Sequence, residues 1–152
     1  MYGLFVFIPG RALPQGSKKP VRNVATGKMS VIDNNPHLAE WRMQVTGYTK
    51  QAMGGATTTF PMEGPVKVYV TFLMARPKYH YGTGKNERKV KDSSPIYPTS
   101  YPDIDKLQRA ILDGFTDAGV WLDDSQVVSI DAQKRYARWD DIPGASVQVL
   151  PL

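Results

Sequence analysis

The amino-acid sequence predicts an α+β domain, with a single small mixed β-sheet and two main helices packed on it. Three patterns lead to this prediction. Side chains alternate between apolar and polar over residues 65–74, as they do in a strand with one buried face. Apolar side chains recur at steps of three and four over residues 37–53 and again over 104–118, the spacing of amphipathic helices. The chain of 152 residues is expected to form one domain, 1–152, because this length suits a single hydrophobic core.

The first half of the chain supplies one strand and one helix. An apolar run over residues 4–8, ended by a Pro-Gly pair, predicts the first strand. Residues 10–34 are rich in Gly, Pro, Lys and Asn and predict a loop with one short extended segment. The helix over 37–53 follows, with Asn35 as its N-cap, and two glycines stop it.

The second half contains a long loop and the remaining elements. Residues 75–102 carry four prolines and show no periodicity, which predicts a long basic loop that is either functional or disordered. The helix over 104–118 is closed by Gly119, and two further strands are expected over 127–136 and 145–150.

Composition excludes several kinds of site. The chain has no cysteine and only two histidines, so neither a disulfide nor a thiolate or His-rich zinc site can form. Any metal ion must be held by oxygen ligands, which favours magnesium, manganese or calcium. No apolar run approaches the roughly 20 residues that cross a bilayer, and we expect neither a membrane partner nor a small-molecule cofactor.

The positive charge is concentrated in the long loop. The whole chain has a net charge of +5, and the window 76–91 alone contains six cations against one glutamate. The cations of this window are Arg76, Lys78, Lys85, Arg88, Lys89 and Lys91. A second basic patch includes Lys18 and Lys19. Such patches can be solvated surface, but aromatic residues interleave with the cations of the loop, which also suits an arm laid against the phosphates and bases of a nucleic acid.

The negative charge is concentrated in the segment 103–124, which holds six of the fourteen acidic residues. Carboxylates gathered in one place repel each other, so a cation or an ion-pair partner is expected there. Asp103 has a simpler explanation as a helix N-cap. Asp105, Arg109 and Asp113 lie on one helical face, where an exposed ladder of ion pairs is the alternative to a functional site.

The spacing also allows a metal site. The chain that returns after the helix can bring Asp124 near Asp103 and Asp105, and three carboxylates around one point would bind a hard divalent cation. Such a cation activates water and neutralises charge on a phosphate. Arg109 would then contact the phosphate itself, because a guanidinium group matches phosphate oxygens well.

The same segment carries a family resemblance. The 25 residues from Asp103 to Val127 read DIDKLQRAILDGFTDAGVWLDDSQV, and this string resembles the signature of the RusA family of Holliday-junction resolvases. The resemblance continues more loosely over residues 38–42 and 134–136.

The resemblance implies a homodimeric endonuclease that cuts four-way DNA junctions with Mg²⁺, for which Mn²⁺ can substitute. It places the catalytic, metal-binding aspartates at Asp103, Asp105 and Asp124. The family often has a lysine where this chain has Arg109, and arginine is a poor proton donor. Two nearby lysines are therefore the candidates for protonating the leaving group: Lys134, which we prefer, and Lys106. The dimer interface is expected on the apolar strand faces at 66–74 and 145–150.

The resemblance also implies a cytoplasmic protein of a bacterial cell, encoded by a phage or prophage. Two other functions stay open at this point. One is a non-catalytic protein that binds branched DNA on the same scaffold. The other is a nuclease of broader substrate range, which would cut linear duplexes as readily as junctions.

Overall fold

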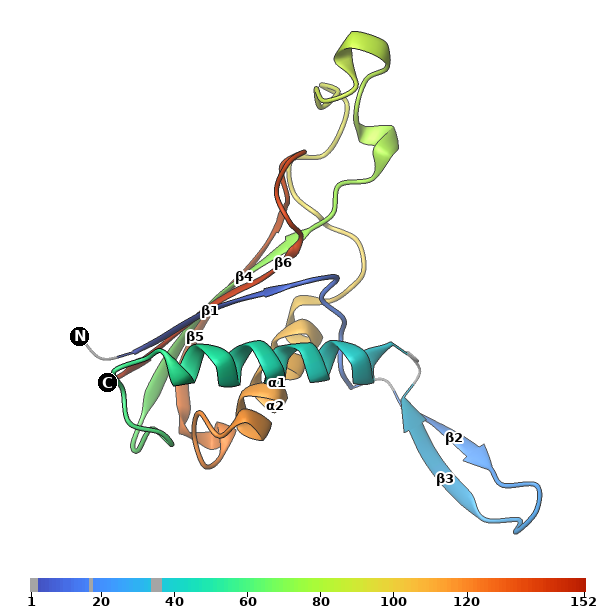
Figure 1. The fold of residues 1–152 in the computed structure, drawn as a ribbon. Coiled ribbons are helices and arrows are strands. Elements are labelled where there is room, and N and C mark those ends of the chain that lie inside the picture. Colours follow the sequence, from blue (N-terminus) through green and yellow to red (C-terminus); the bar gives the residue numbers. More distant parts are fainter. Residues whose placement is uncertain (1–2, 17, 34–36) are drawn as a thin grey trace.

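The computed structural model describes residues 3–16, 18–33 and 37–152, with only the backbone described for 18–21 and 30–33. Its centre is a four-stranded mixed sheet of β1 (Leu4–Pro9), β4 (Val66–Met74), β5 (Val127–Tyr136) and β6 (Gly144–Pro151), in the order β1-β6-β4-β5 (Figure 1). Strand β6 pairs antiparallel with both β1 and β4, whereas β4 and β5 are parallel. Parallel neighbours need a long crossover connection, and here it contains the long loop and the second helix.

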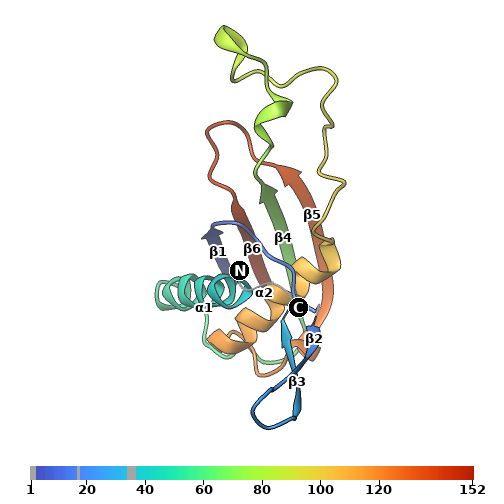
Figure 2. The same ribbon diagram turned by 90° about the vertical axis from the view of Figure 1, so that its right-hand side faces the viewer.

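Two helices, α1 (Leu38–Gly54) and α2 (Ile104–Ala118), lie on the same face of the sheet, as the two views agree (Figures 1 and 2). Their apolar faces and the inner face of the sheet form one core, which buries Trp41, Val45, Val68, Phe72, Leu107, Ile111, Phe115 and Val147. The α+β class, the mixed sheet and the two packed helices are confirmed.

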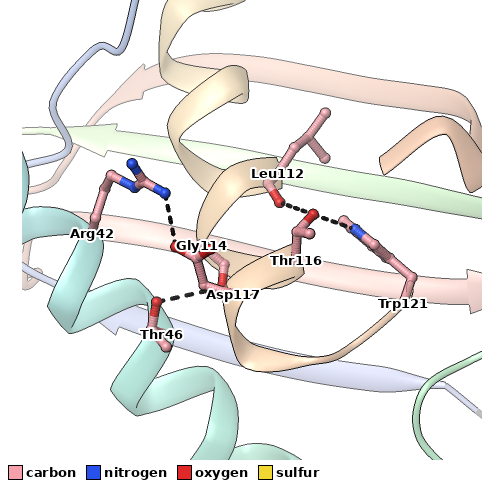
Figure 3. Close-up of polar contacts among 7 residues, drawn as sticks. All are labelled: Arg42, Thr46, Leu112, Gly114, Thr116, Asp117 and Trp121. Carbon is pink, nitrogen blue, oxygen red and sulfur yellow. Dashed lines mark hydrogen bonds and ion pairs between the residues drawn. The ribbon is translucent and has the colours of Figure 1, made fainter. Parts of the chain in front are cut away.

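The two helices approach each other closely at Gly114. A Cβ atom at this position would collide with the side chain of Val45 on α1, so only glycine fits here without a shift. Polar contacts flank this point: the Arg42 guanidinium is 2.7 Å from an Asp117 carboxylate oxygen, and Thr46 donates to the Gly114 carbonyl at 3.4 Å (Figure 3). Beyond them, the Trp121 indole donates to the Thr116 hydroxyl at 2.8 Å. These contacts fix α2 against α1 and against the chain that leaves it.

Strands β2 (Lys18–Arg22) and β3 (Met29–Asp33) form a separate hairpin that projects from the body of the molecule (Figure 1). The sequence predicted only one extended segment here. Both strands have only five residues, KKPVR and MSVID, and neither shows a clear alternation of apolar and polar side chains by which a half-buried strand is recognised. The N-cap predicted at Asn35 lies outside the described residues, and the structure places the cap of α1 at His37.

The strand faces predicted to hold a dimer interface are part of the core. Val66, Val70 and Val149 are almost fully buried, in one core with side chains of α1 and α2. The alternating pattern correctly identified the buried side of β4, but this side meets the protein's own helices.

The loop 75–102 extends beyond the end of β4 as an arm (Figure 1). It contains short 3₁₀ turns at Lys78–His80 and Gly84–Asn86 and an isolated bridge between Tyr81 and Val90. In the part of the chain that is described, no helix is both long and apolar enough to cross a membrane.

Candidate active site

The first two predicted aspartates lie at the start of α2. Asp103 is the N-cap residue, with extended backbone angles φ −72° and ψ 139°, but its side chain makes no capping hydrogen bond. The position predicted from the sequence is therefore confirmed, while the capping role is not observed. Asp105 lies in the first turn, and both side chains are exposed. Their negative charge is favoured here by the partial positive charge at the N-terminus of the helix.

Lys134 fixes the chain that leads into Asp103. It lies on β5 opposite Phe72, and its Nζ donates to the carbonyl oxygens of Ser100 and Pro102, both at 2.9 Å. Pro102 directly precedes Asp103. Two of the three N–H donors of the ammonium group are thus used to hold the loop.

Asp124 is presented by a 3₁₀ turn between α2 and β5. The turn spans Asp124–Gln126 and has a capping box: the Asp123 carboxylate accepts from the Ser125 N–H at 2.8 Å, and the Gln126 side chain accepts from the Asp123 N–H at 3.3 Å. The Gln126 amide also donates to the carbonyls of Met62 and Gly64, at 2.8 and 3.0 Å. The turn is therefore tied to the segment that enters β4.

The charges around Asp124 act on its ionisation. Partial loss of solvent around this largely exposed carboxyl raises its pKa above the ordinary value, and the charges of Asp123 and Asp113 raise the pKa further. The charge of Arg109 lowers it. The pKa of Asp123 shifts down, because its carboxylate accepts the hydrogen bonds of Ser125. Asp124, Asp113 and Arg109 therefore share one electrostatic neighbourhood.

Arg109 is exposed on α2 and packs beside the segment that precedes the β2–β3 hairpin. A Cβ atom added to Gly16 would lie 3.0 Å from Nη1 of Arg109, and the φ of +118° at Gly16 is one that glycine adopts most readily. Of the three ion pairs within the described residues, none involves Arg109. The ladder of direct ion pairs from Asp105 through Arg109 to Asp113 is accordingly not formed.

The three predicted metal ligands flank α2, two at its start and one after its end. Across residues 3–16, 18–33 and 37–152, no three Asp, Glu or His side chains are gathered closely enough to hold a metal ion. The donor chemistry fits a hard cation, since all three groups are exposed carboxylates. Their convergence on one ion stays a prediction.

The predicted DNA-binding cations of the arm fall into two groups, one held by contacts within the protein and one exposed. Arg76 holds the base of the arm: its guanidinium lies over the Tyr136 ring, 4.1 Å from the centroid, and donates to the Pro95 carbonyl at 2.8 Å. The other cations of the arm are exposed: Lys78, Lys85, Arg88, Lys89 and Lys91. The arm is folded on itself, because the N–H of Gly82 donates to the Lys89 carbonyl. The side chains of Lys18 and Lys19 lie outside the described residues.

A family model for the endodeoxyribonuclease RusA matches residues 9–149 of the chain. The chain belongs to the RusA family. The matched range contains α2, the turn at Asp124 and all of β5, so every predicted catalytic position falls within it. No curated protein matches the chain.

Membership of the RusA family implies an endonuclease that resolves Holliday junctions in DNA recombination. The substrate is accordingly branched DNA.

The part that Gln126 plays in this turn was not predicted from the sequence. Its side chain closes the capping box and bonds two carbonyls of the preceding segment, which makes it the main anchor of the turn that presents Asp124. The signal was available, because an acidic N-cap followed three residues later by glutamine is the pattern of a capping box.

Proposed function

We propose that this RusA-family endonuclease hydrolyses phosphodiester bonds of four-way junctions with Mg²⁺, or Mn²⁺ in its place, bound by Asp103, Asp105 and Asp124. The observation that carries the proposal is the N-terminus of α2, where Asp103 occupies the cap position and leaves its carboxylate out of the capping bond. A carboxylate that accepts no hydrogen bond from the N–H groups of its own helix is available to a ligand. The raised pKa of Asp124 supports the same proposal: it is caused first by loss of solvent and then by the negative charges of Asp123 and Asp113, and a bound cation would favour the ionised carboxylate against both.

The bound cation would supply charge neutralisation at the phosphate and a more acidic water. Arg109 contributes a fixed positive charge for the phosphate oxygens, since a guanidinium group keeps its proton throughout. Lys134 holds the loop that begins α2, and with it the position of Asp103. We assign Lys134 this positioning role in place of proton donation, because two of its donors already serve backbone carbonyls.

The proposed enzyme acts as a homodimer. A four-way junction has near two-fold symmetry, so a two-fold dimer presents identical sites to opposing strands and can make paired, symmetric cuts. The exposed cations of the arm would contact the DNA backbone, and recognition would depend mostly on the shape of the junction.

The test is cleavage of a synthetic four-way junction in Mg²⁺, in Mn²⁺ and in EDTA, with a linear duplex as the substrate control. We expect paired nicks that are confined to the junction and absent in EDTA. Cleavage of the duplex at a similar rate would indicate a nuclease of broader range. Tight junction binding without cleavage in either metal would indicate a non-catalytic junction-binding protein.

The same assay checks the first mutational prediction. Asp105→Asn should lower the cleavage rate by more than about a hundredfold, because it removes a charged metal ligand. Junction binding should be kept or strengthened, since one charge that repels DNA is lost. The control is Asp117→Asn on the same helix, which removes only the surface ion pair with Arg42. Weaker binding together with intact cleavage would contradict the assignment of the metal site.

A further inference from the structure

A cavity of about 530 Å³ lies directly beside the start of α2. Its walls come from the loop that ends at Pro102, from the ends of β4 and β5, and from the segment after β1. The residues that matter for its chemistry are Arg11, Ser100, Tyr101, Pro102, Lys134 and Tyr136. A volume in this range is typical of sites for small ligands or single groups of larger ones.

The cavity and the predicted cleavage site share a wall. Pro102 lines the cavity and is bonded to Asp103. The two hydrogen bonds from Lys134, to the carbonyls of Ser100 and Pro102, hold this wall in place. A group that enters the cavity would therefore lie near a phosphate that a metal ion held at Asp103.

The lining offers aromatic surface and hydrogen-bond donors. Tyr101 is 67% exposed, so its ring is accessible to a ligand. Tyr136 has two ring contacts, with the Arg76 guanidinium over its ring at 4.1 Å and His80 edge-on at 5.5 Å. Arg11 adds a positive charge, and the third N–H of the Lys134 ammonium remains for an acceptor on the ligand.

A nucleobase matches this combination, because it has two aromatic faces, acceptor atoms on its edges and a phosphate on its backbone. Stacking on tyrosine is favourable for any base, and bases near a branch point leave the stack at lower cost than those within a regular duplex. We propose that the cavity receives one unstacked base of the junction, next to the phosphate at Asp103. This inference rests on the proposed function for the identity of the substrate.

A second cavity, of about 780 Å³, does not fit a nucleic acid as well. Three arginines line it, but Arg76 is used at the base of the arm and Arg138 pairs with Asp141 at 3.1 Å. Asp140 and Asp141 also line it, and their carboxylates repel a phosphate backbone.

The test couples a change in the protein to a change in the DNA. Tyr101→Ala removes the exposed ring, and a series of junctions carries a single abasic nucleotide at each position around the branch point. Equilibrium binding is measured by fluorescence anisotropy in EDTA, so that no cleavage is needed. We expect one position at which the abasic nucleotide weakens binding by wild type roughly tenfold. At that position Tyr101→Ala should add little further loss, because the base and the ring contribute through the same contact.

Two variants control this experiment. Tyr97→Ala removes another exposed tyrosine of the arm, one that lines the second cavity and not the first. The factor by which this variant weakens junction binding should multiply with the factor caused by the abasic nucleotide, at every position. Tyr101→Phe keeps the ring and should bind like wild type. Independent, multiplying losses for Tyr101→Ala at all positions would overturn the proposal, and so would a Tyr101→Phe variant as weak as Tyr101→Ala.

The outcome is separable from that of the proposed function. Coupling in the binding assay, with no junction cut in Mg²⁺ or Mn²⁺, would keep the base cavity and end the catalytic proposal. Metal-dependent cleavage without coupling would keep the endonuclease and overturn the cavity.

Discussion

Asp124 and Asp123 are adjacent in the chain, yet the fold acts on their ionisation in opposite directions. Asp124 loses solvent and faces like charges, which raises its pKa, whereas Asp123 accepts hydrogen bonds from Ser125, which lowers its pKa. In the absence of metal, these two shifts make opposite contributions to the pH dependence of stability.

Asp124→Asn should make the metal-free protein more stable at neutral pH by about 0.2–0.5 kcal/mol, the usual range for exposed like-charge contacts. Because the pKa of Asp124 is raised on folding, its contribution to stability is complete below the unfolded pKa and is lost as the pH rises through the folded pKa. The difference between variant and wild type should therefore grow with pH, in denaturant melts in EDTA from about pH 4 to about pH 8.

Asp123→Ala provides the opposite control. It removes the cap of the turn and a carboxylate of lowered pKa, so it should lower the free energy of unfolding at neutral pH, and lower it less in acid. An Asp124→Asn variant whose stability difference does not vary with pH would contradict the proposed charge neighbourhood.

The role of Lys134 can be decided from a pH–rate profile. Lys134→Met leaves two loop carbonyls without their donor, which should cost about 1–3 kcal/mol and lower the cleavage rate at every pH. If Lys134 only positions the loop, the fall of the cleavage rate at alkaline pH should occur at the same pH in the variant as in wild type. Loss of that fall in the variant would instead make Lys134 the proton donor. Lys106→Met is the comparison, because Lys106 is the other lysine near the site.

At the level of elements, the sequence correctly located the helices and strands whose apolar side chains recur with a clear period or whose end has a clear stop signal. Helix α2 spans Ile104–Ala118, as predicted, because its apolar stripe is complete and Gly119 ends it with a φ of +87°. Strand β5 also has the predicted bounds, Val127–Tyr136. The β2–β3 hairpin was missed, since its pairing joins two segments of only five residues each, too short to show a period. The hydrogen bonds of Lys134 and the contacts of Arg76 at the base of the arm leave no local pattern, because each joins residues distant in sequence.

The arm is the element whose charge we expect to contact DNA. Replacing Lys85, Arg88 and Lys89 with glutamine should weaken junction binding and lower the salt dependence of log K by up to about one unit for each cation. These side chains are exposed, so the fold should persist. Lys50→Gln, an exposed change on α1, is the control and should leave the slope unaltered. A triple variant with the wild-type slope would mean that the arm does not lie on the DNA.

On the scale of the whole molecule, the two faces of the sheet differ in what covers them. Both helices lie on one face, and in the described part of the chain no helix covers the other (Figures 1 and 2). The alternation in β4 indicates which side chains are buried, but it cannot tell whether a helix of the same chain or a second subunit buries them. This is why the predicted interface lies in the core. The open face carries Phe5, which is 64% exposed, and Tyr69, which is 37% exposed.

If the proposed homodimer forms through this open face, a charge at its apolar part should separate the subunits. Phe5→Glu should raise the dimer dissociation constant at least about tenfold, because the carboxylate would lose solvent without gaining a partner. Light scattering after gel filtration should then report a monomer, and the junction should receive unpaired nicks. Met43→Glu on the helical side, where Met43 is 75% exposed, should leave the dimer intact. A dimeric Phe5→Glu variant that still makes paired cuts would place the interface elsewhere. A monomeric wild type would contradict the homodimer itself, because paired cuts depend on a second site.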